Sequence, residues 1–230
     1  MSEVYAMRVI ARARNAYTDN FSVPRQPGLI PEVVTRIEFE EAYRVPEALR
    51  GLEGFSHLWL LWCFDRKEQA GWHPTVRPPR LGGNTRVGVF ASRAPVRPNP
   101  IGLSVVRLLS VEPGPALLVR GADLADGTPI FDIKPYLPYA DCVPEATGGF
   151  TEGLDEKRLE VDCDPDLLAP LGAEAGALLA VLSHDPRPGY QRDENRVYGF
   201  RFAGCEVRFR VAGSRLTVLE IRRPGAPSPV

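Results

Sequence analysis

The sequence predicts a mainly β protein, with an antiparallel barrel or sandwich over residues 1–147 and a small α+β domain over residues 148–230. Three observations lead to this class. Short runs that are apolar or that alternate apolar and polar residues recur along the first part. The chain holds 23 prolines and 21 glycines, which favour many turns and short strands. A leucine-rich run of helical character occurs only late in the chain, before three more strand-like runs.

The first part contains seven runs that we expect to form strands. Ser56–Phe64 is apolar after its first two residues, as expected for a strand covered on both faces. The others are separated from it and from one another by turn signals: Met7–Arg14, Val33–Phe39, Arg86–Ala91, Leu103–Val111, Ala116–Ala122 and Ile130–Tyr136. A short helix is expected over Pro46–Leu52, because proline is tolerated in a first helical turn.

The second part follows a polar, glycine-bearing stretch, Val143–Lys157, that is typical of an inter-domain linker. A short strand is expected over Arg158–Cys163 and a helix over Asp164–Leu182, which Gly172 and Gly176 could divide. The remaining runs predict a three-stranded meander over Val197–Phe202, Cys205–Val211 and Leu216–Arg222.

Composition argues against several classes of protein. No run of 18 apolar residues and no secretory leader is visible, so we expect a cytoplasmic protein without a membrane partner. The four cysteines are far apart and form no CxxC pair, and the chain has only three histidines. We therefore expect neither structural disulfides nor a bound metal.

One stretch, Gly71–Val111, carries an unusual charge pattern. It holds six arginines and no Asp, Glu or Lys, although the chain's 29 acidic residues in 230 would place about five in a window of this length. Arginine favours planar, bidentate contacts with phosphate or carboxylate groups. Because the net charge of the chain is only -1, the stretch is a local positive field, and an anionic ligand is the first hypothesis.

Within this stretch, residues 92–102 (SRAPVRPNPIG) form a proline-rich loop between two expected strands. Its three prolines restrict the backbone, so Arg93 and Arg97 would be presented on a stiff support. Such preorganisation lowers the entropy that a ligand must overcome. The alternative is an ordinary surface loop with solvated arginines.

Two other stretches carry polar groups that could serve a site. The long segment Asn15–Ile30 contains Pro24-Arg25-Gln26-Pro27-Gly28, in which two prolines bracket a cation and an amide; it is either a binding loop or a plain connector. His57 could be an acid or base, although a histidine beside an apolar run is more often part of a core.

The expected strand Ile130–Tyr136 places Asp132, Lys134 and Tyr136 on one face. An acid, an amine and a phenol side by side could handle protons in catalysis. The alternative is a salt bridge between the first two, with the tyrosine used for packing.

Several long motifs, taken in order, resemble one family closely. They are PRQPG, GFSHLWLLWCF, TVRPPRLGGNTRVGVFASR, RPNPIGLS, DGTPIFDIKPYLPYAD and DPRPGY. On these motifs the chain resembles the TsaA-like/TrmO family of tRNA methyltransferases, and the resemblance covers nearly the whole chain. It implies a TsaA-like β-barrel that uses S-adenosylmethionine and works as a homodimer. The implied reaction methylates N6 of threonylcarbamoyladenosine at position 37 of threonine tRNA.

The resemblance also implies a cofactor site in the barrel domain. Its residues would be Arg25, Gln26, Pro27, Asp65, Arg66, Arg93, Leu103, Asp126, Gly127 and Thr128. Arg93 is suited to the methionyl carboxylate. For the proton on the target N6, the candidates remain Asp132 or Tyr136, with Lys134 stabilising the resulting charge.

The tRNA is a polyanion, so cationic residues outside the cofactor site are its candidate contacts. The candidates are the cations Arg77, Arg80, Arg97 and Arg187, joined by the neutral Asn99 and Tyr190, with the tyrosine placed to stack on an unpaired base. We expect Arg93 to serve the cofactor and Arg187 to serve only the tRNA. Two other functions remain open: a non-catalytic β-barrel RNA-binding module, and a nucleotide-acting hydrolase suggested only by the arginine-rich loop.

Overall fold

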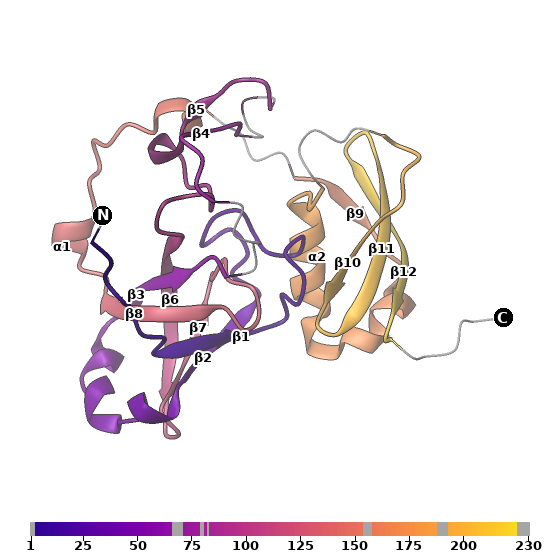
Figure 1. Ribbon diagram of the computed structural model, residues 1–230. Helices are drawn as coiled ribbons and strands as arrows, with labels where there is room; N and C mark the ends of the chain where they lie inside the picture. Colours follow the sequence, from indigo (N-terminus) through magenta and orange to yellow (C-terminus); the bar gives the residue numbers. More distant parts are fainter. Residues whose placement is uncertain are drawn as a thin grey trace.

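The computed structural model describes residues 3–65, 71–78, 81, 83–153, 158–187 and 193–224. Two packed bodies lie side by side, a barrel and a smaller sheet with a helix against it (Figure 1). Each body has its own cluster of buried apolar residues. The predicted mainly β class is confirmed.

The first body is a closed barrel rather than a sandwich. Its strands follow the order β1-β2-β7-β6-β3-β8 and pair antiparallel throughout, with β1 bonded to β8 to close the barrel. Their alternating residues fill the interior, where Ala11, Leu60 and Ile130 are fully buried. The strands are β1 (Ala11–Arg14), β2 (Val34–Phe39), β3 (His57–Cys63), β6 (Ile101–Glu112), β7 (Ala116–Arg120) and β8 (Pro129–Pro135).

The expectation that Ser56–Phe64 is covered on both faces was wrong. In β3 the side chains alternate, so Leu58 and Leu60 are fully buried while Trp59 and Leu61 are half-buried. The reason is barrel closure, which gives each strand one interior and one exterior face. On the exterior face, the indole N–H of Trp59 has a hydrogen-bond partner, since Nε1 donates to Asp141 Oδ2 at 2.9 Å.

Some predicted elements are shorter in the structure. Regular pairing of the first strand begins at Ala11, and the run Arg86–Ala91 has only β5 (Val87–Gly88), paired with β4 (Thr75–Val76), before the 3₁₀ turn η5 (Val89–Ala91). The helix expected over Pro46–Leu52 is divided at Gly51, which has φ 86°. The remaining short elements of this part are η1 (Glu41–Tyr43), η2 (Pro46–Leu49), η3 (Leu52–Gly54), α1 (Pro138–Asp141) and η6 (Gly149–Thr151).

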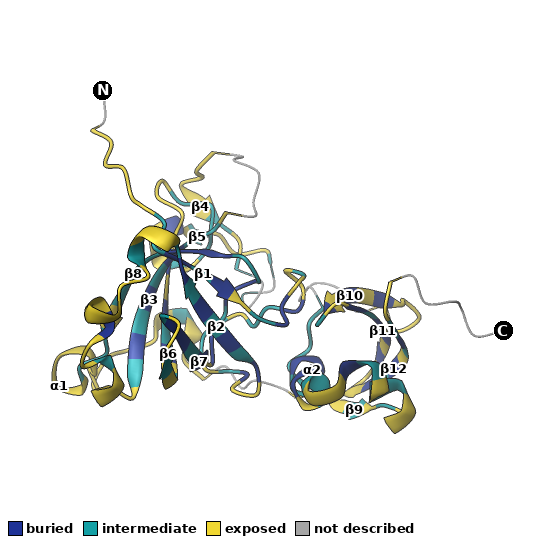
Figure 2. Ribbon diagram, turned by 90° about the horizontal axis from the view of Figure 1, so that it is seen from below, coloured by how far each residue is buried: buried dark blue, intermediate teal, exposed yellow. Residues whose placement is uncertain are grey.

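The second body is a four-stranded sheet of order β10-β11-β12-β9, with a helix on one face (Figure 2). The predicted meander forms its antiparallel part, and β9 joins parallel to β12. The chain turns at Ala203 and Gly204, both at positive φ, between the first two strands of the meander. The elements are β9 (Glu160–Asp162), η7 (Pro165–Glu174), α2 (Ala175–Ser183), β10 (Tyr198–Phe202), β11 (Cys205–Ala212) and β12 (Arg215–Arg222).

Residues Pro165–Ser183 are the one described helical run with the length and hydropathy of a membrane span. Gly172, at φ 56° and ψ -122°, interrupts the helix, as the sequence suggested. Leu178 and Leu182 are fully buried in the core of the second body. The run is therefore a broken core helix packed against the sheet.

A segment of the first part enters the core of the second. Ala16, Tyr17, Ile30 and Val33 are all buried in the same cluster as the residues of α2 and β10–β12. In Figure 1 this indigo segment crosses from the barrel to the region of α2. The two bodies thus share a structural element that the sequence analysis assigned to one of them.

Candidate active site

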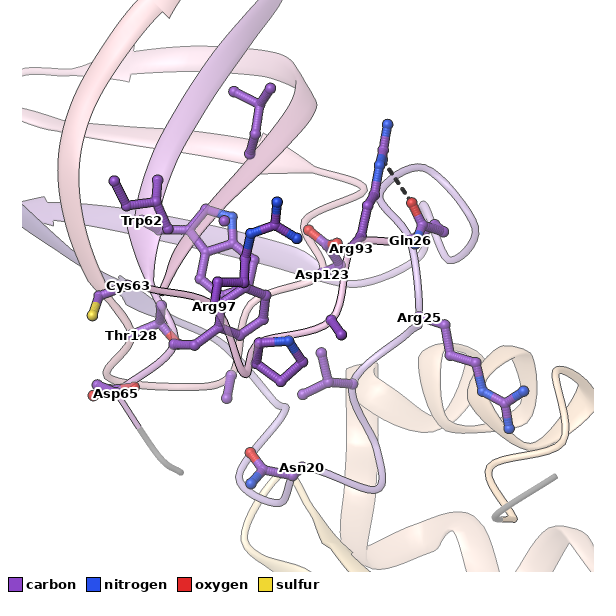
Figure 3. A pocket seen from close by; sticks show the side chains of 18 of the residues that line it. Asn20, Arg25, Gln26, Trp62, Cys63, Asp65, Arg93, Arg97, Asp123 and Thr128 are labelled. Carbon is purple, nitrogen blue, oxygen red and sulfur yellow. Dashed lines mark hydrogen bonds between the residues drawn. The ribbon is translucent and has the colours of Figure 1, made fainter. Parts of the chain in front are cut away.

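A pocket of about 780 Å³ opens where the barrel meets the segment at residues 20–26 and the proline-rich loop (Figure 3). This size lies within the usual range for small-molecule sites. Its lining is more apolar than polar, with a few convergent polar groups. The lining residues are Asn20, Val23, Pro24, Arg25, Gln26, Trp62, Cys63, Phe64, Asp65, Ser92, Arg93, Ala94, Pro95, Arg97, Ile101, Gly102, Leu103, Asp123, Ala125 and Thr128.

The indole of Trp62 forms the floor of the pocket. It lies over Gly102 on the neighbouring strand, and a Cβ at that glycine would be 2.2 Å from Trp62 Cε2. The indole Nε1 donates to Ser104 Oγ at 2.9 Å, and the ring packs against Phe64 with centroids 4.3 Å apart. A rigid aromatic surface therefore faces the cavity, suited to a flat heterocycle.

Asp123 places a largely buried carboxylate on this floor. It accepts a short hydrogen bond from the hydroxyl of Ser104, whose own oxygen accepts from Trp62. Burial raises the pKa of Asp123 to about 6, against the opposing effects of the Ser104 hydrogen bond and the positive charge of Arg93. The sequence analysis missed this residue, although it stands three positions before Asp126 in the same motif-bearing stretch.

Arg93 supplies a cation at the pocket wall. Its Nη1 donates to Gln26 Oε1 at 2.7 Å, which joins the proline-rich loop to the segment at residues 20–26 (Figure 3). The residue as a whole is exposed, so its remaining donors can reach a ligand. The structure thus brings together Arg93 and Gln26, two residues predicted for the cofactor.

Arg97 makes its contacts within the proline-rich loop, and the predicted tRNA contact stays a prediction. Its Nη1 donates to the carbonyl oxygens of Ser92 at 2.7 Å and Val89 at 3.2 Å, and its guanidinium lies 5.8 Å from the ring centroid of Phe90. These contacts brace the proline-rich loop from within. Arg97 also lines the pocket, whereas it was predicted to contact tRNA.

Six of the predicted cofactor residues line this pocket: Arg25, Gln26, Asp65, Arg93, Leu103 and Thr128. Arg66 lies outside the described residues. Pro27, Asp126 and Gly127 are absent from the described lining. Asp126 Oδ1 instead accepts from the amide of Asn15 at 3.1 Å, and the Gly127 carbonyl accepts from Arg12, so this turn holds the barrel wall.

The predicted proton-handling set does not line the pocket. Asp132 and Lys134 form an ion pair on the barrel exterior, 3.0 Å between Oδ2 and Nζ. The ring of Tyr136 packs beside Trp59, with centroids 5.8 Å apart. These are the contacts of the alternative interpretation, a salt bridge with a packing tyrosine. A catalytic role for the three stays a prediction without support from the pocket geometry.

The predicted tRNA contacts lie in different surroundings. Arg77 and Asn99 are exposed and are not part of the described pocket lining, while Arg80 and Tyr190 lie outside the described residues. The side chain of Arg187 is only 13% exposed, because its guanidinium is paired with Asp185. Its contact with tRNA stays a prediction.

The pocket combines a cation on its wall, a buried carboxylate on its floor and an aromatic surface between apolar walls. Such a set fits a ligand that carries a carboxylate, a positive centre and a flat ring. This is the chemistry of S-adenosylmethionine, which has all three.

Comparisons with known proteins give the same class. Residues 12–142 match the family model of the tRNA-methyltransferase O N-terminal domain, and residues 159–224 match the TrmO C-terminal domain. The chain is 41% identical to the tRNA (adenine(37)-N6)-methyltransferase of Escherichia coli over 223 residues, which cover 91% of this chain and 95% of that protein. It is 40% identical to a putative S-adenosylmethionine-dependent methyltransferase of Pseudomonas aeruginosa, covering 89% of this chain and 92% of that one.

Solved structures agree with the sequence matches. The crystal structure of TrmO from Pseudomonas aeruginosa superposes with a TM-score of 0.77 at 32% identity, covering 95% of this chain and 99% of that chain. Both bodies of the fold are thus covered by the match. The chain belongs to the tRNA-methyltransferase O family.

Proposed function

We propose that the chain transfers a methyl group from S-adenosylmethionine to N6 of the threonylcarbamoyladenosine at position 37 of threonine tRNA. It would act in the cytoplasm as a homodimer. The reaction class is supported by the relatives, which include tRNA (adenine(37)-N6)-methyltransferases. The choice of tRNA and the dimer come from the family resemblance alone, and the compartment is the expectation drawn from the composition of the chain.

The observation that supports the proposal is that Arg93 and Asp123 line one pocket together with the indole of Trp62. When bound, S-adenosylmethionine supplies an activated methyl group on a positively charged sulfur. Arg93 would take its carboxylate in a charge-assisted hydrogen bond. Asp123 would face a positive centre of the cofactor, and Trp62 and Phe64 offer a surface for its adenine.

The chain's contribution to the rate would come mainly from positioning. Gln26 fixes Arg93 through the 2.7 Å hydrogen bond, and the prolines of the loop keep the backbone in place. Holding two reactants in line can supply a large part of a transfer barrier. The apolar walls, which include Leu103 and Ile101, would keep water from the reacting atoms.

The tRNA would approach over the acid-free stretch. Arg77, Arg86 and Arg93 are exposed there. Neutralising phosphates with such arginines releases counterions, so binding should weaken steeply with salt. The anticodon loop would then lie beside the cofactor pocket.

Nucleoside mass spectrometry tests the proposal. Threonine tRNA that carries threonylcarbamoyladenosine but lacks the methyl group is incubated with the protein and S-adenosylmethionine. The proposal expects the modified nucleoside to gain one methyl group, and only when the cofactor is present. A non-catalytic RNA-binding module would bind the tRNA and produce no methylated nucleoside, and calorimetry would then detect no binding of S-adenosylmethionine.

A further inference from the structure

The segment between β1 and β2 contacts the pocket on one side and the second body on the other. Toward the barrel, Asn20, Val23, Pro24, Arg25 and Gln26 line the pocket. A segment of this length that carries pocket residues must be held in place by contacts elsewhere, because an unrestrained loop would lose ordering entropy on binding a ligand.

The other side of the segment is anchored in the second body. Tyr17 is fully buried, with 0% exposure, and its ring packs on Phe202, with ring centroids 6.1 Å apart. Ile30 and Val33 are buried in the same cluster. The amide of Ala203 donates to the carbonyl of Ala16 at 2.8 Å, which adds a backbone bond across the two bodies.

A side-chain hydrogen bond also links this segment to the second body at the pocket. Arg25 Nη2 donates to the main-chain oxygen of Arg187 at 2.9 Å, and Figure 3 shows the Arg25 side chain turned toward the second body. The carbonyl of Arg187 is presented by a tight turn that follows α2. In that turn, Arg187 Nε and Nη2 hold the two carboxylate oxygens of Asp185 at 2.8 and 2.9 Å.

Specific side-chain contacts hold the conformation of this turn. Asp185 has φ 50°, a backbone conformation that is uncommon for residues other than glycine and that aspartate adopts more readily than most. The bidentate contact of Arg187 restrains this conformation, and the Tyr198 ring lies 5.9 Å from the same guanidinium. The hydrogen bond to the Asp185 carboxylate raises the pKa of Arg187, because the carboxylate stabilises the charged guanidinium in this turn.

We propose that the Asp185–Arg187 turn is a positioning element of the methyl-donor pocket, acting through Arg25 and the segment it belongs to. The inference rests on the proposed function, because it takes S-adenosylmethionine as the ligand of the pocket. It replaces the expectation that Arg187 serves only tRNA. Because coupling between two sites is reciprocal, a tRNA held by the second body would tighten cofactor binding by the same factor that the cofactor tightens tRNA binding.

The test uses the full chain and measures S-adenosylmethionine binding by calorimetry. Arg187→Ala should weaken binding about 3- to 20-fold although the residue is absent from the described pocket lining. In steady-state assays it should raise the KM for S-adenosylmethionine and leave kcat at saturating cofactor nearly unchanged. Arg187→Lys keeps the charge but loses the planar fork, so it should show part of the effect with less risk to folding.

Arg208→Ala is the matched control. Arg208 is an arginine of the same body, paired with Glu220 at 3.3 Å on the sheet's exposed face, and it is not part of the described pocket lining. Its loss should change cofactor affinity by less than about twofold. A further readout needs no variant: adding S-adenosylmethionine to the wild type should slow hydrogen exchange at the Ala203 amide, in the second body.

The outcomes separate the two proposals. If the wild type binds S-adenosylmethionine but Arg187→Ala and Arg187→Lys bind it equally well, and Ala203 exchange is unchanged by the cofactor, the inference is overturned and the proposed function stands. A loss of kcat without a change in KM would also overturn it, since that is the mark of a general loss of folded enzyme. If the wild type does not bind the cofactor, the proposed function fails, and the inference with it.

Discussion

Trp62 and Gly102 face each other on adjacent strands of the barrel, and the indole occupies the space that a side chain at Gly102 would need. A Cβ there would be 2.2 Å from Trp62 Cε2 and 2.4 Å from Cζ2. The register between β3 and β6 pairs these two residues directly. The pocket floor therefore depends on a glycine in the middle of a binding motif.

Gly102→Ala should displace the indole and break its 2.9 Å hydrogen bond to Ser104. Overpacking of this kind costs about 1–3 kcal/mol of stability. We expect at least a tenfold loss of S-adenosylmethionine affinity by calorimetry. The control is Gly88→Ala, since Gly88 has nothing within 4 Å of a built Cβ and a negative φ. Equal effects at both positions would contradict the role given to the floor.

Asp123→Asn should stabilise the ligand-free protein while weakening cofactor binding. The pKa of Asp123 is raised to about 6 in the folded state by burial, so its ionised form opposes folding. This cost is absent below the unfolded pKa of about 4, grows as the pH rises, and is complete above about 6. At pH 8 we expect a gain on the order of 1–2 kcal/mol in chemical denaturation, which disappears near pH 4. Unchanged stability at pH 8 would contradict the claim that the ionised Asp123 carboxylate opposes folding.

Cofactor affinity should depend on pH through the same carboxyl group. Below the pKa of about 6, protonated Asp123 loses its attraction for the positive centre of the cofactor. Calorimetry between pH 5 and 8 should therefore show S-adenosylmethionine binding weaken as the pH falls through about 6. The Asp123→Asn variant should give a flat profile over this range, and a wild-type slope that persists in the variant would assign the titration to another group.

Arg93→Ala should weaken S-adenosylmethionine binding about 10- to 100-fold, the usual value of a hydrogen bond between charged groups. Arg86→Ala is the matched control, because Arg86 belongs to the same acid-free stretch, donates to Thr75 Oγ1 at 3.2 Å and is not among the described lining residues. A decarboxylated S-adenosylmethionine makes the test specific. It should bind the wild type and Arg93→Ala alike, and a remaining difference would show that Arg93 does not hold the carboxylate.

Arg97→Ala should loosen the proline-rich loop rather than remove a phosphate contact. Its donors are bonded to the carbonyls of Ser92 and Val89. We expect faster proteolysis in residues 89–97 and an unchanged salt dependence of tRNA binding. Arg77→Ala, at an exposed position, should instead reduce the slope of log K against log salt by about one. If Arg97→Ala reduced the slope and Arg77→Ala left it unchanged, the result would favour Arg97 as the tRNA contact.

The sequence was informative where local rules decide the structure. Alternation in Val33–Phe39 and the turn at Ala203-Gly204 predicted β2 and the β10–β11 connection to within a residue. Glycine at position 172 divides the helical run as its backbone freedom suggested. The resemblance supplied the closed barrel, because alternation alone describes a sandwich equally well.

The sequence was uninformative where a contact joins distant residues. Asp123 accepts its hydrogen bond from Ser104, 19 positions earlier in the chain, and nothing in its immediate neighbours predicts that contact. Asp132 and Lys134 share a strand face, as predicted, but only barrel closure decides that this face is the exterior. The link from Arg25 to Arg187 spans 162 positions.

The sharing of Tyr17, Ile30 and Val33 with the core of the second body has a consequence for biosynthesis. These apolar residues leave the ribosome long before Phe209, Val211 and Leu216, which belong to the same core. The barrel strands can pair earlier, but the pocket wall made by residues 20–26 is completed only after β11 and β12 have been synthesised. Until then the nascent chain exposes the apolar residues of this segment, and chaperones that act during synthesis bind surface of this kind.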